Sequence, residues 1–127
     1  YYTATQTDGM DNLNQFTERC QSYFQEAMTA GISFKTIEAL LTYLAGKAKE
    51  HPNGEKLIVI LDEFPYWVNA DPSIPSLLQR FWDEHGRHSK LMLILCGSSI
   101  SLMVDYALAE KSPLYGRCGG ICLCRHA

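Results

Sequence analysis

Two uninterrupted apolar runs restrict the folds open to this chain more than any other feature. They are LIVIL at Leu57–Leu61 and LMLILC at Leu91–Cys96, and neither alternates between apolar and polar residues. A strand with one face in water shows that alternation, whereas a strand covered on both faces does not. The two runs therefore predict buried strands of a parallel sheet.

Helical patterns separate the strands. Apolar residues recur at three- and four-residue steps over residues 11–28, 34–48 and 75–82, while YYTAT at residues 1–5 and ICLC at residues 121–124 are strand-like. Alternation of this kind predicts an α/β fold with a mostly parallel sheet sandwiched by helices. With 127 residues, the chain is long enough for one domain and too short for two.

Polar residues stand where each apolar run ends. Asp62 and Glu63 follow the first run, and Ser98 and Ser99 follow the second. Parallel sheets bind their ligands at the carboxyl ends of strands. In phosphoryl-transfer sites one acid holds Mg²⁺ while another orients and deprotonates a water molecule. A structural interpretation stays open, in which Asp62 caps the next turn and Glu63 is solvated at the sheet edge.

Four segments, taken in order, resemble a known family. LIVILDEFPYW, PSLLQRFWDEH, LMLILCGSSISLM and SPLYGR together are similar to the AAA-like, STAND-related predicted ATPases of prokaryotes and archaea. That family belongs to the additional-strand division of the P-loop NTPases, and the resemblance runs from about Tyr1 to Arg117. It implies a partial P-loop NTPase core that acts on ATP with Mg²⁺.

The resemblance also implies roles for individual residues. Asp62 would be the Walker B carboxylate that holds Mg²⁺, and Glu63 would be the catalytic base. Ser98 would be the sensor at the end of the next strand, with Ser99 beside it as a nucleotide-binding hydroxyl. Arg117, in the LYGR block, would contact phosphate or a neighbouring subunit.

One departure from the family pattern is large. Family members begin with a strand and a G-x-x-x-x-G-K-[ST] loop that holds the phosphates, and this sequence contains no such motif. We therefore expect residues 1–127 to be a partial ATPase domain that carries the Walker B and sensor half, with the P-loop unit before Tyr1. The segment alone is expected to be inactive. The missing strand would leave an open edge on Leu91–Cys96, to be paired by the last strand or by a second copy of the chain.

Other interpretations remain open. One is a non-catalytic α/β module that recruits a protein partner, and another is a metal-dependent nuclease, although the D/E-x-K frame of such enzymes is missing. The aromatic residues after the acids, Phe64, Tyr66 and Trp67, are expected to pack a loop against the next helix, with base stacking as the alternative. The tail residues Cys118, Cys122, Cys124 and His126 could be drawn as a metal site, but their spacing is not typical of zinc motifs.

Composition excludes several classes. The net charge of −3 and the scattered basic residues argue against a nucleic-acid surface. No apolar run approaches the ~20 residues that cross a bilayer. The chain has five cysteines, and Cys20 and Cys96 lie inside apolar patterns, where a thiol behaves as a small hydrophobe, so we expect a reducing cytoplasm.

Overall fold

A computed structural model describes residues 1–24, 33–51 and 54–117. The strands are β1 (Tyr2–Thr3), β2 (Leu57–Asp62) and β3 (Leu91–Leu95). The α-helices are α1 (Gly9–Phe24), α2 (Ile37–Ala48), α3 (Phe64–Ala70), α4 (Ile74–Glu84) and α5 (Ile100–Met103). A 3₁₀ helix, η3 (Gly86–His88), follows α4, and a π-helical turn, η4 (Val104–Leu108), continues α5.

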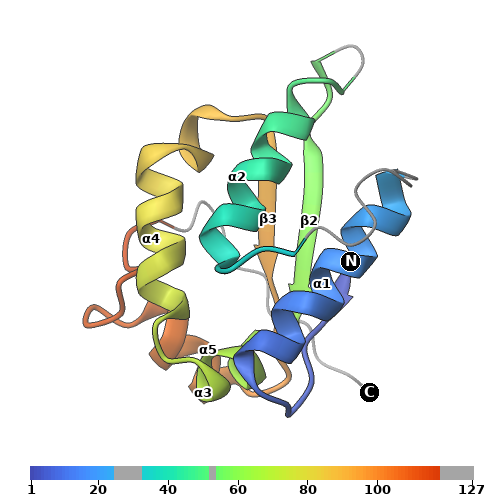
Figure 1. Cartoon of the computed structure of the whole chain (residues 1–127). Helices are drawn as coiled ribbons and strands as arrows, with labels where there is room; N and C mark the ends of the chain where they lie inside the picture. The colour runs from blue at the N-terminus through green and yellow to red at the C-terminus, as the bar shows by residue number, and fades with distance from the viewer. Residues whose placement is uncertain (25–32, 52–53, 118–127) are drawn as a thin grey trace, which may run out of the picture.

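The strands form a parallel sheet in the order β1-β2-β3. Tyr2 pairs with Leu61 at one side of β2, and Leu61 pairs with Leu95 at the other. α2 lies across the sheet with α4 beside it, while α3 and α5 gather where the strand arrows point (Figure 1). The predicted α/β fold class with a parallel sheet is confirmed.

The two faces of the sheet differ in burial. Leu57, Val59 and Leu61 are buried and face the helical layer, because alternate residues of a strand point to one face. On the other face, Ile58 is 54% exposed and Met92 is 45% exposed. Apolar residues on both faces explain why the run shows no alternation, and the described helices bury one of these faces.

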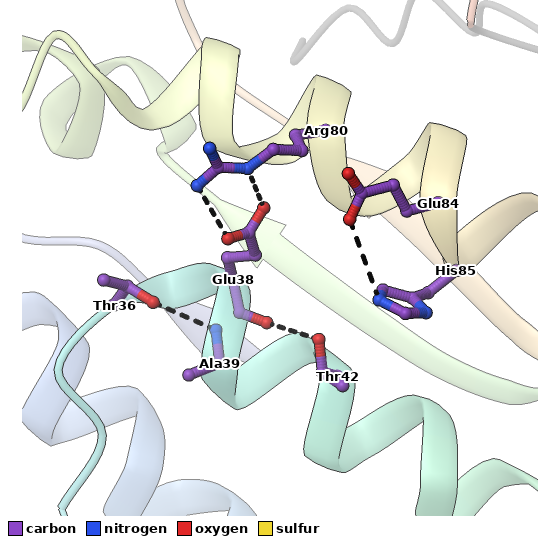
Figure 2. A network of polar contacts seen from close by, with 7 residues as sticks. All are labelled: Thr36, Glu38, Ala39, Thr42, Arg80, Glu84 and His85. Carbon is purple, nitrogen blue, oxygen red and sulfur yellow. Dashed lines mark hydrogen bonds and ion pairs between the residues drawn. The ribbon is translucent and has the colours of Figure 1, made fainter.

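Helices α2 and α4 are joined on their outer side by an ion pair. Nε and Nη2 of Arg80 donate to the two carboxylate oxygens of Glu38 at 2.6 and 2.8 Å. Figure 2 shows this pair together with the N-cap of α2, where the Thr36 hydroxyl accepts a 3.1 Å hydrogen bond from the Ala39 amide. Beneath the pair, Leu40, Leu41 and other apolar residues of α2 are fully buried.

A buried asparagine attaches β1 to α1. Asn12 is 0% exposed, and its Oδ1 accepts hydrogen bonds from the Tyr2 hydroxyl at 2.6 Å and the Thr5 amide at 3.0 Å. Its Nδ2 donates to the Thr5 and Asp8 carbonyl oxygens, each at 3.2 Å. All its polar atoms therefore have partners, as a fully buried amide requires. The short strand β1 is held by this side chain as well as by the sheet.

The residues after the acids form a helix, where a loop was expected. Phe64–Ala70 is α3, and Pro65 stands in its first turn, where proline lacks only an amide hydrogen that the helix would leave unbonded. Phe64 and Trp67 are 0% and 1% exposed. The expectation that Phe64 and Trp67 pack is confirmed, and base stacking is not open to these two buried rings. Tyr66 is partly buried and packs against the same core.

The buried aromatic residues join three elements. Tyr2 of β1 stacks on Phe16 of α1 with 5.5 Å between ring centroids, and Trp67 of α3 meets both rings edge-on at 5.8 and 6.0 Å. Aromatic pairs prefer these offset and edge-on arrangements. This cluster fixes β1 and α3 next to the carboxyl end of β2.

Of the two cysteines in the described residues, Cys20 matches the expectation of a buried thiol and Cys96 matches it in part. Cys20 is buried in α1, and burial raises the pKa of its thiol to about 12. Cys96 directly follows β3 and is partly buried. Cys118, Cys122, Cys124 and His126, together with the strand predicted at 121–124, lie outside the described residues.

Candidate functional site

The carboxyl ends of β2 and β3 lie side by side. The Cys96 amide donates to the Leu61 carbonyl oxygen at 3.0 Å, and the Phe64 amide donates to the Cys96 carbonyl oxygen at 2.9 Å. The hydrogen-bond ladder therefore continues past both strands to the point where the polar residues begin. This geometry brings Asp62, Glu63 and Ser98 to one edge of the sheet.

Asp62 is the last residue of β2 and is partly exposed. Its Oδ1 accepts a 2.9 Å hydrogen bond from the Glu63 amide, and its Oδ2 accepts a hydrogen bond from the Tyr1 hydroxyl. The carboxylate is thus oriented by one donor on each oxygen. Part of the capping interpretation is present in the structure, because one of the two donors is a local amide.

Glu63 has an unusual backbone. Its φ of 52° and ψ of 38° are left-handed, and it is the only residue other than glycine with positive φ in the described ranges. This conformation costs an L-residue roughly 1–2 kcal/mol. The left-handed residue forms the corner between β2 and α3, and its side chain, which does not cap α3, accepts a 3.3 Å hydrogen bond from the Ser98 hydroxyl.

The two serines after β3 have different contacts. Ser98 is exposed and points its hydroxyl to Oε2 of Glu63. Ser99 is the N-cap of α5, where its Oγ accepts from the Leu102 amide at 3.4 Å and lies 3.3 Å from Oγ of Ser101. The structure therefore joins Ser98 to the acids and gives Ser99 a local capping contact.

Arg117 is engaged elsewhere. Its Nη2 and Nε donate to the carboxylate oxygens of Asp83, in α4, at 2.9 and 3.3 Å, and its Nη1 donates to the Tyr115 carbonyl oxygen at 3.0 Å. These hydrogen bonds lower the pKa of Asp83 and raise that of Arg117. The structure brings Arg117 to α4 and does not bring it to Asp62, Glu63 or Ser98.

The acids at the strand ends suit a hard cation. Mg²⁺ is bound through one or two carboxylates, with water and substrate phosphate completing its six ligands. Asp62 and Glu63 can supply one or two oxygens of that set. In the part of the chain that the structure describes, no group of three or more His, Cys, Asp or Glu side chains could form a complete metal site. The residues present fit a magnesium ion shared with phosphate.

A separate cavity of about 360 Å³ lies among the helices. It is bounded by the first residues of α1, α2 and α4 and by one side of α3, with Trp67 and Ile74 among its apolar lining. Asp62, Glu63 and Ser98 do not line it. The acids and this cavity are therefore separate sites in the described part of the chain.

Two features of the site escape prediction from sequence. The first is Tyr1, whose hydroxyl donates to Asp62 although the two residues are 61 positions apart in the chain. The strand-like YYTAT run gave a signal for β1, but it did not reveal which strand β1 pairs with. The second is Gly97, where an added Cβ would lie 2.8 Å from Sδ of Met103 and 3.0 Å from Cδ of Pro65. That close approach lets α3 and α5 meet beside the acids.

No helix in residues 1–24, 33–51 and 54–117 is long and apolar enough to cross a membrane. No solved structure matches the chain. Among curated proteins, an uncharacterized protein of Methanocaldococcus jannaschii, MJECL04, is 33% identical over 121 residues. The match covers 95% of this chain and 24% of that protein, so the chain spans about a quarter of this relative.

A second relative is the uncharacterized protein MJ0424 of the same organism. It is 29% identical over 89 residues, which cover 70% of this chain and 85% of that protein. A sequence family described as an ATPase domain, predominantly from Archaea, matches residues 1–125. This match takes in the three strands, the acids and the serines. The chain belongs to this predominantly archaeal family of ATPase domains.

Proposed function

We propose that this chain supplies the hydrolytic half of an ATPase site, with Asp62 holding Mg²⁺ and Glu63 activating the attacking water. The observation that supports the proposal most is the meeting of the two strand ends, which brings Asp62, Glu63 and Ser98 to one edge. Family membership supports an ATPase-type function and the binding of nucleotide. The roles of the individual residues are our assignment.

Each side chain has a distinct part in the proposed reaction. The magnesium ion, when bound, would neutralise charge on the phosphates. Glu63 uses Oε2 to accept from Ser98, which leaves Oε1 to accept a hydrogen bond, and then a proton, from a water molecule. The Ser98 hydroxyl is a donor that can turn from Glu63 to an oxygen of the γ-phosphate. Ser99 would contribute to nucleotide binding by holding the start of α5 in place.

Arg117 has a smaller part in this proposal. It could contact a phosphate or a neighbouring subunit only after leaving Asp83, with which it shares two hydrogen bonds. We therefore give Arg117 no step in hydrolysis in the arrangement that the structure shows.

The phosphate-holding loop is assigned to polypeptide other than these 127 residues. No G-x-x-x-x-G-K-[ST] motif occurs in the sequence, and the relative MJECL04 is about four times as long as the matched segment. Within the described residues, β3 pairs with β2 alone, so its outer edge can accept a further strand. We propose that this edge takes up the strand that carries the loop, or a second copy of the chain.

The test is the variant Glu63→Gln in a protein that contains this segment and hydrolyses ATP. Loss of the base should lower turnover by about 10²–10⁴-fold, while ATP binding in the presence of Mg²⁺ persists. Glu18→Gln is a matched control, because Glu18 is exposed on α1. Steady-state phosphate release and equilibrium ATP binding measure the two effects. Undiminished ATP turnover in Glu63→Gln would show that Glu63 is not the catalytic base.

A second candidate is a non-catalytic protein-interaction module. The exposed apolar face with Ile58 and Met92 favours it, since large apolar side chains gathered on a surface often mark a contact site. In that case Asp62 and Glu63 would serve only the corner between β2 and α3. The module predicts that Asp62→Asn and Glu63→Gln leave all partner binding unchanged and that no ATP turnover depends on them.

A further inference from the structure

Tyr1 lies next to Asp62 because of the register of β1. Thr3 pairs with Asp62, and the Ala4 amide donates to the Asp62 carbonyl oxygen at 2.8 Å. Residues two apart in a strand point to the same face. Tyr1 and Thr3 therefore share the face of the sheet on which Asp62 lies, and the phenol of Tyr1 can reach the carboxylate.

The position of Tyr1 is fixed by its neighbour. Tyr2 is 4% exposed, its hydroxyl donates to buried Asn12 at 2.6 Å, and its ring stacks on Phe16. Tyr1 itself is 64% exposed. Tyr2 thus anchors the backbone, and the exposed side chain of the preceding residue, Tyr1, reaches Asp62. The Tyr1 ring itself does not fill the core.

Each carboxylate oxygen of Asp62 accepts a hydrogen bond from a different donor. The Tyr1 hydroxyl donates to Oδ2, and the Glu63 amide donates to Oδ1. Each carboxylate oxygen can accept more than one hydrogen bond or ligand, so both retain room for a cation. Donors behind a metal-binding carboxylate orient it, and their loss typically lowers metal affinity by about 10–100-fold.

The Tyr1 hydroxyl remains a donor at neutral pH. Its hydrogen bond to Asp62 raises the pKa of Tyr1 above the ordinary value of about 10. The phenol therefore keeps its proton at neutral pH and can donate it in a hydrogen bond to Asp62.

We infer that Tyr1 is a positioning residue for the metal-binding carboxylate: its hydroxyl holds Asp62 in the orientation that takes up a divalent cation. This inference rests on the proposed role of Asp62. It adds β1 to a site that would otherwise consist of the ends of β2 and β3.

The experiment titrates Mn²⁺ against a protein that contains this segment and hydrolyses ATP, and it follows free Mn²⁺ by electron paramagnetic resonance. Tyr1→Phe keeps the ring and removes the donor, so Mn²⁺ affinity should fall by about 10-fold. Asp62→Asn should abolish the saturable binding. Tyr23→Phe is the matched control: it removes the same hydroxyl group from a tyrosine that is 65% exposed on α1 and whose ring contacts Phe24. The midpoint of thermal unfolding should stay the same in Tyr1→Phe, which separates positioning from a structural role.

The other outcomes are distinguishable. If Asp62→Asn abolishes binding while Tyr1→Phe binds as tightly as wild type, or more tightly, the positioning role of Tyr1 is overturned and the role of Asp62 stands. If wild type shows no saturable binding, or Asp62→Asn binds like wild type, the assignment of Asp62 falls and the inference falls with it. A lowered unfolding midpoint in Tyr1→Phe with unchanged affinity would also overturn the positioning role.

Discussion

The hydroxyl of Ser98, beyond the end of β3, donates across 3.3 Å to Oε2 of Glu63, at the corner that follows β2. This bond connects two strands through side chains, beside the backbone bonds that already join them. Ser99, the next residue, turns away from Glu63 and caps α5. The hydroxyls of the adjacent residues Ser98 and Ser99 therefore make different contacts, one to Glu63 and one to the start of α5.

That separation leads to a prediction for the two serines. In a protein that hydrolyses ATP with this segment, Ser98→Ala should lower turnover by roughly 10²–10³-fold, because a donor to the developing charge is lost. Ser99→Ala should instead cost about 0.5–1 kcal/mol of stability through loss of a helix cap. Phosphate release and urea unfolding measure the two effects. Equal losses of turnover in both variants would contradict the division of roles.

The left-handed backbone at Glu63 predicts an unusual order of stabilities. Glu63→Gly should be more stable than Glu63→Ala by about 0.5–1 kcal/mol, because glycine adopts positive φ without strain and this gain exceeds its larger entropy in the unfolded chain. Glu63→Val should be the least stable of the three, since a β-branched residue tolerates this region worst. Urea unfolding of the three variants gives the order. If alanine matches or exceeds glycine, the corner is not strained.

The close contact at Gly97 gives a third prediction. Gly97→Ala should destabilise the chain by about 1–3 kcal/mol, because the new methyl group would meet Met103 at 2.8 Å and the rigid ring of Pro65 at 3.0 Å. Gly46→Ala is the matched control. No atom lies within 4 Å of the added Cβ in α2, so this variant should gain about 0.5–1 kcal/mol. A stabilising effect of Gly97→Ala in thermal or urea unfolding would show that α3 and α5 do not need this close approach.

The Glu38–Arg80 pair predicts a pH dependence of stability. Hydrogen bonding to Arg80 lowers the pKa of Glu38, so the pair stabilises the fold above the unfolded value of about 4.3 and loses this effect as pH falls through the lower folded value. Arg80→Ala should therefore lower the unfolding midpoint by roughly 1–4 °C at pH 7, and this difference should shrink as the pH falls below about 4.3.

A double-mutant cycle with Glu38→Gln checks the origin of that effect. Both side chains are solvent-accessible, so the coupling should be small and should weaken in high salt. A difference between wild type and Arg80→Ala that grows toward acid pH would contradict the sign that the lowered pKa of Glu38 requires.

Much of the scaffold could be predicted from periodicity. The run Leu57–Leu61 appears as β2, which is one residue longer, and Leu91–Cys96 appears as β3, which is one residue shorter. The helical pattern over residues 75–82 appears as α4, with Pro75 in its first turn. These elements follow from the hydrophobic pattern and from proline chemistry, both of which act over a few neighbouring residues.

The local geometry of the site could not be predicted in the same way. Helix α3 has seven residues, too few for a clear helical period, so the acids and aromatics looked like a strand end and a loop. Glutamate has no special preference for left-handed φ, and nothing near Glu63 in the sequence signals it. The contact between Tyr1 and Asp62 depends on strand pairing, which a single sequence does not reveal.

The order of the strands in the sheet, β1-β2-β3, is the same as their order in the sequence. Crossovers of one hand that all travel the same way lay their helices along one side of a sheet. In the described part of the chain, the opposite face of the sheet has no helix over it, and Ile58 and Met92 are exposed there. The folded polypeptide should therefore be amphiphilic. It should bind dyes such as anilinonaphthalene sulfonate and enhance their fluorescence, and it should self-associate at high concentration.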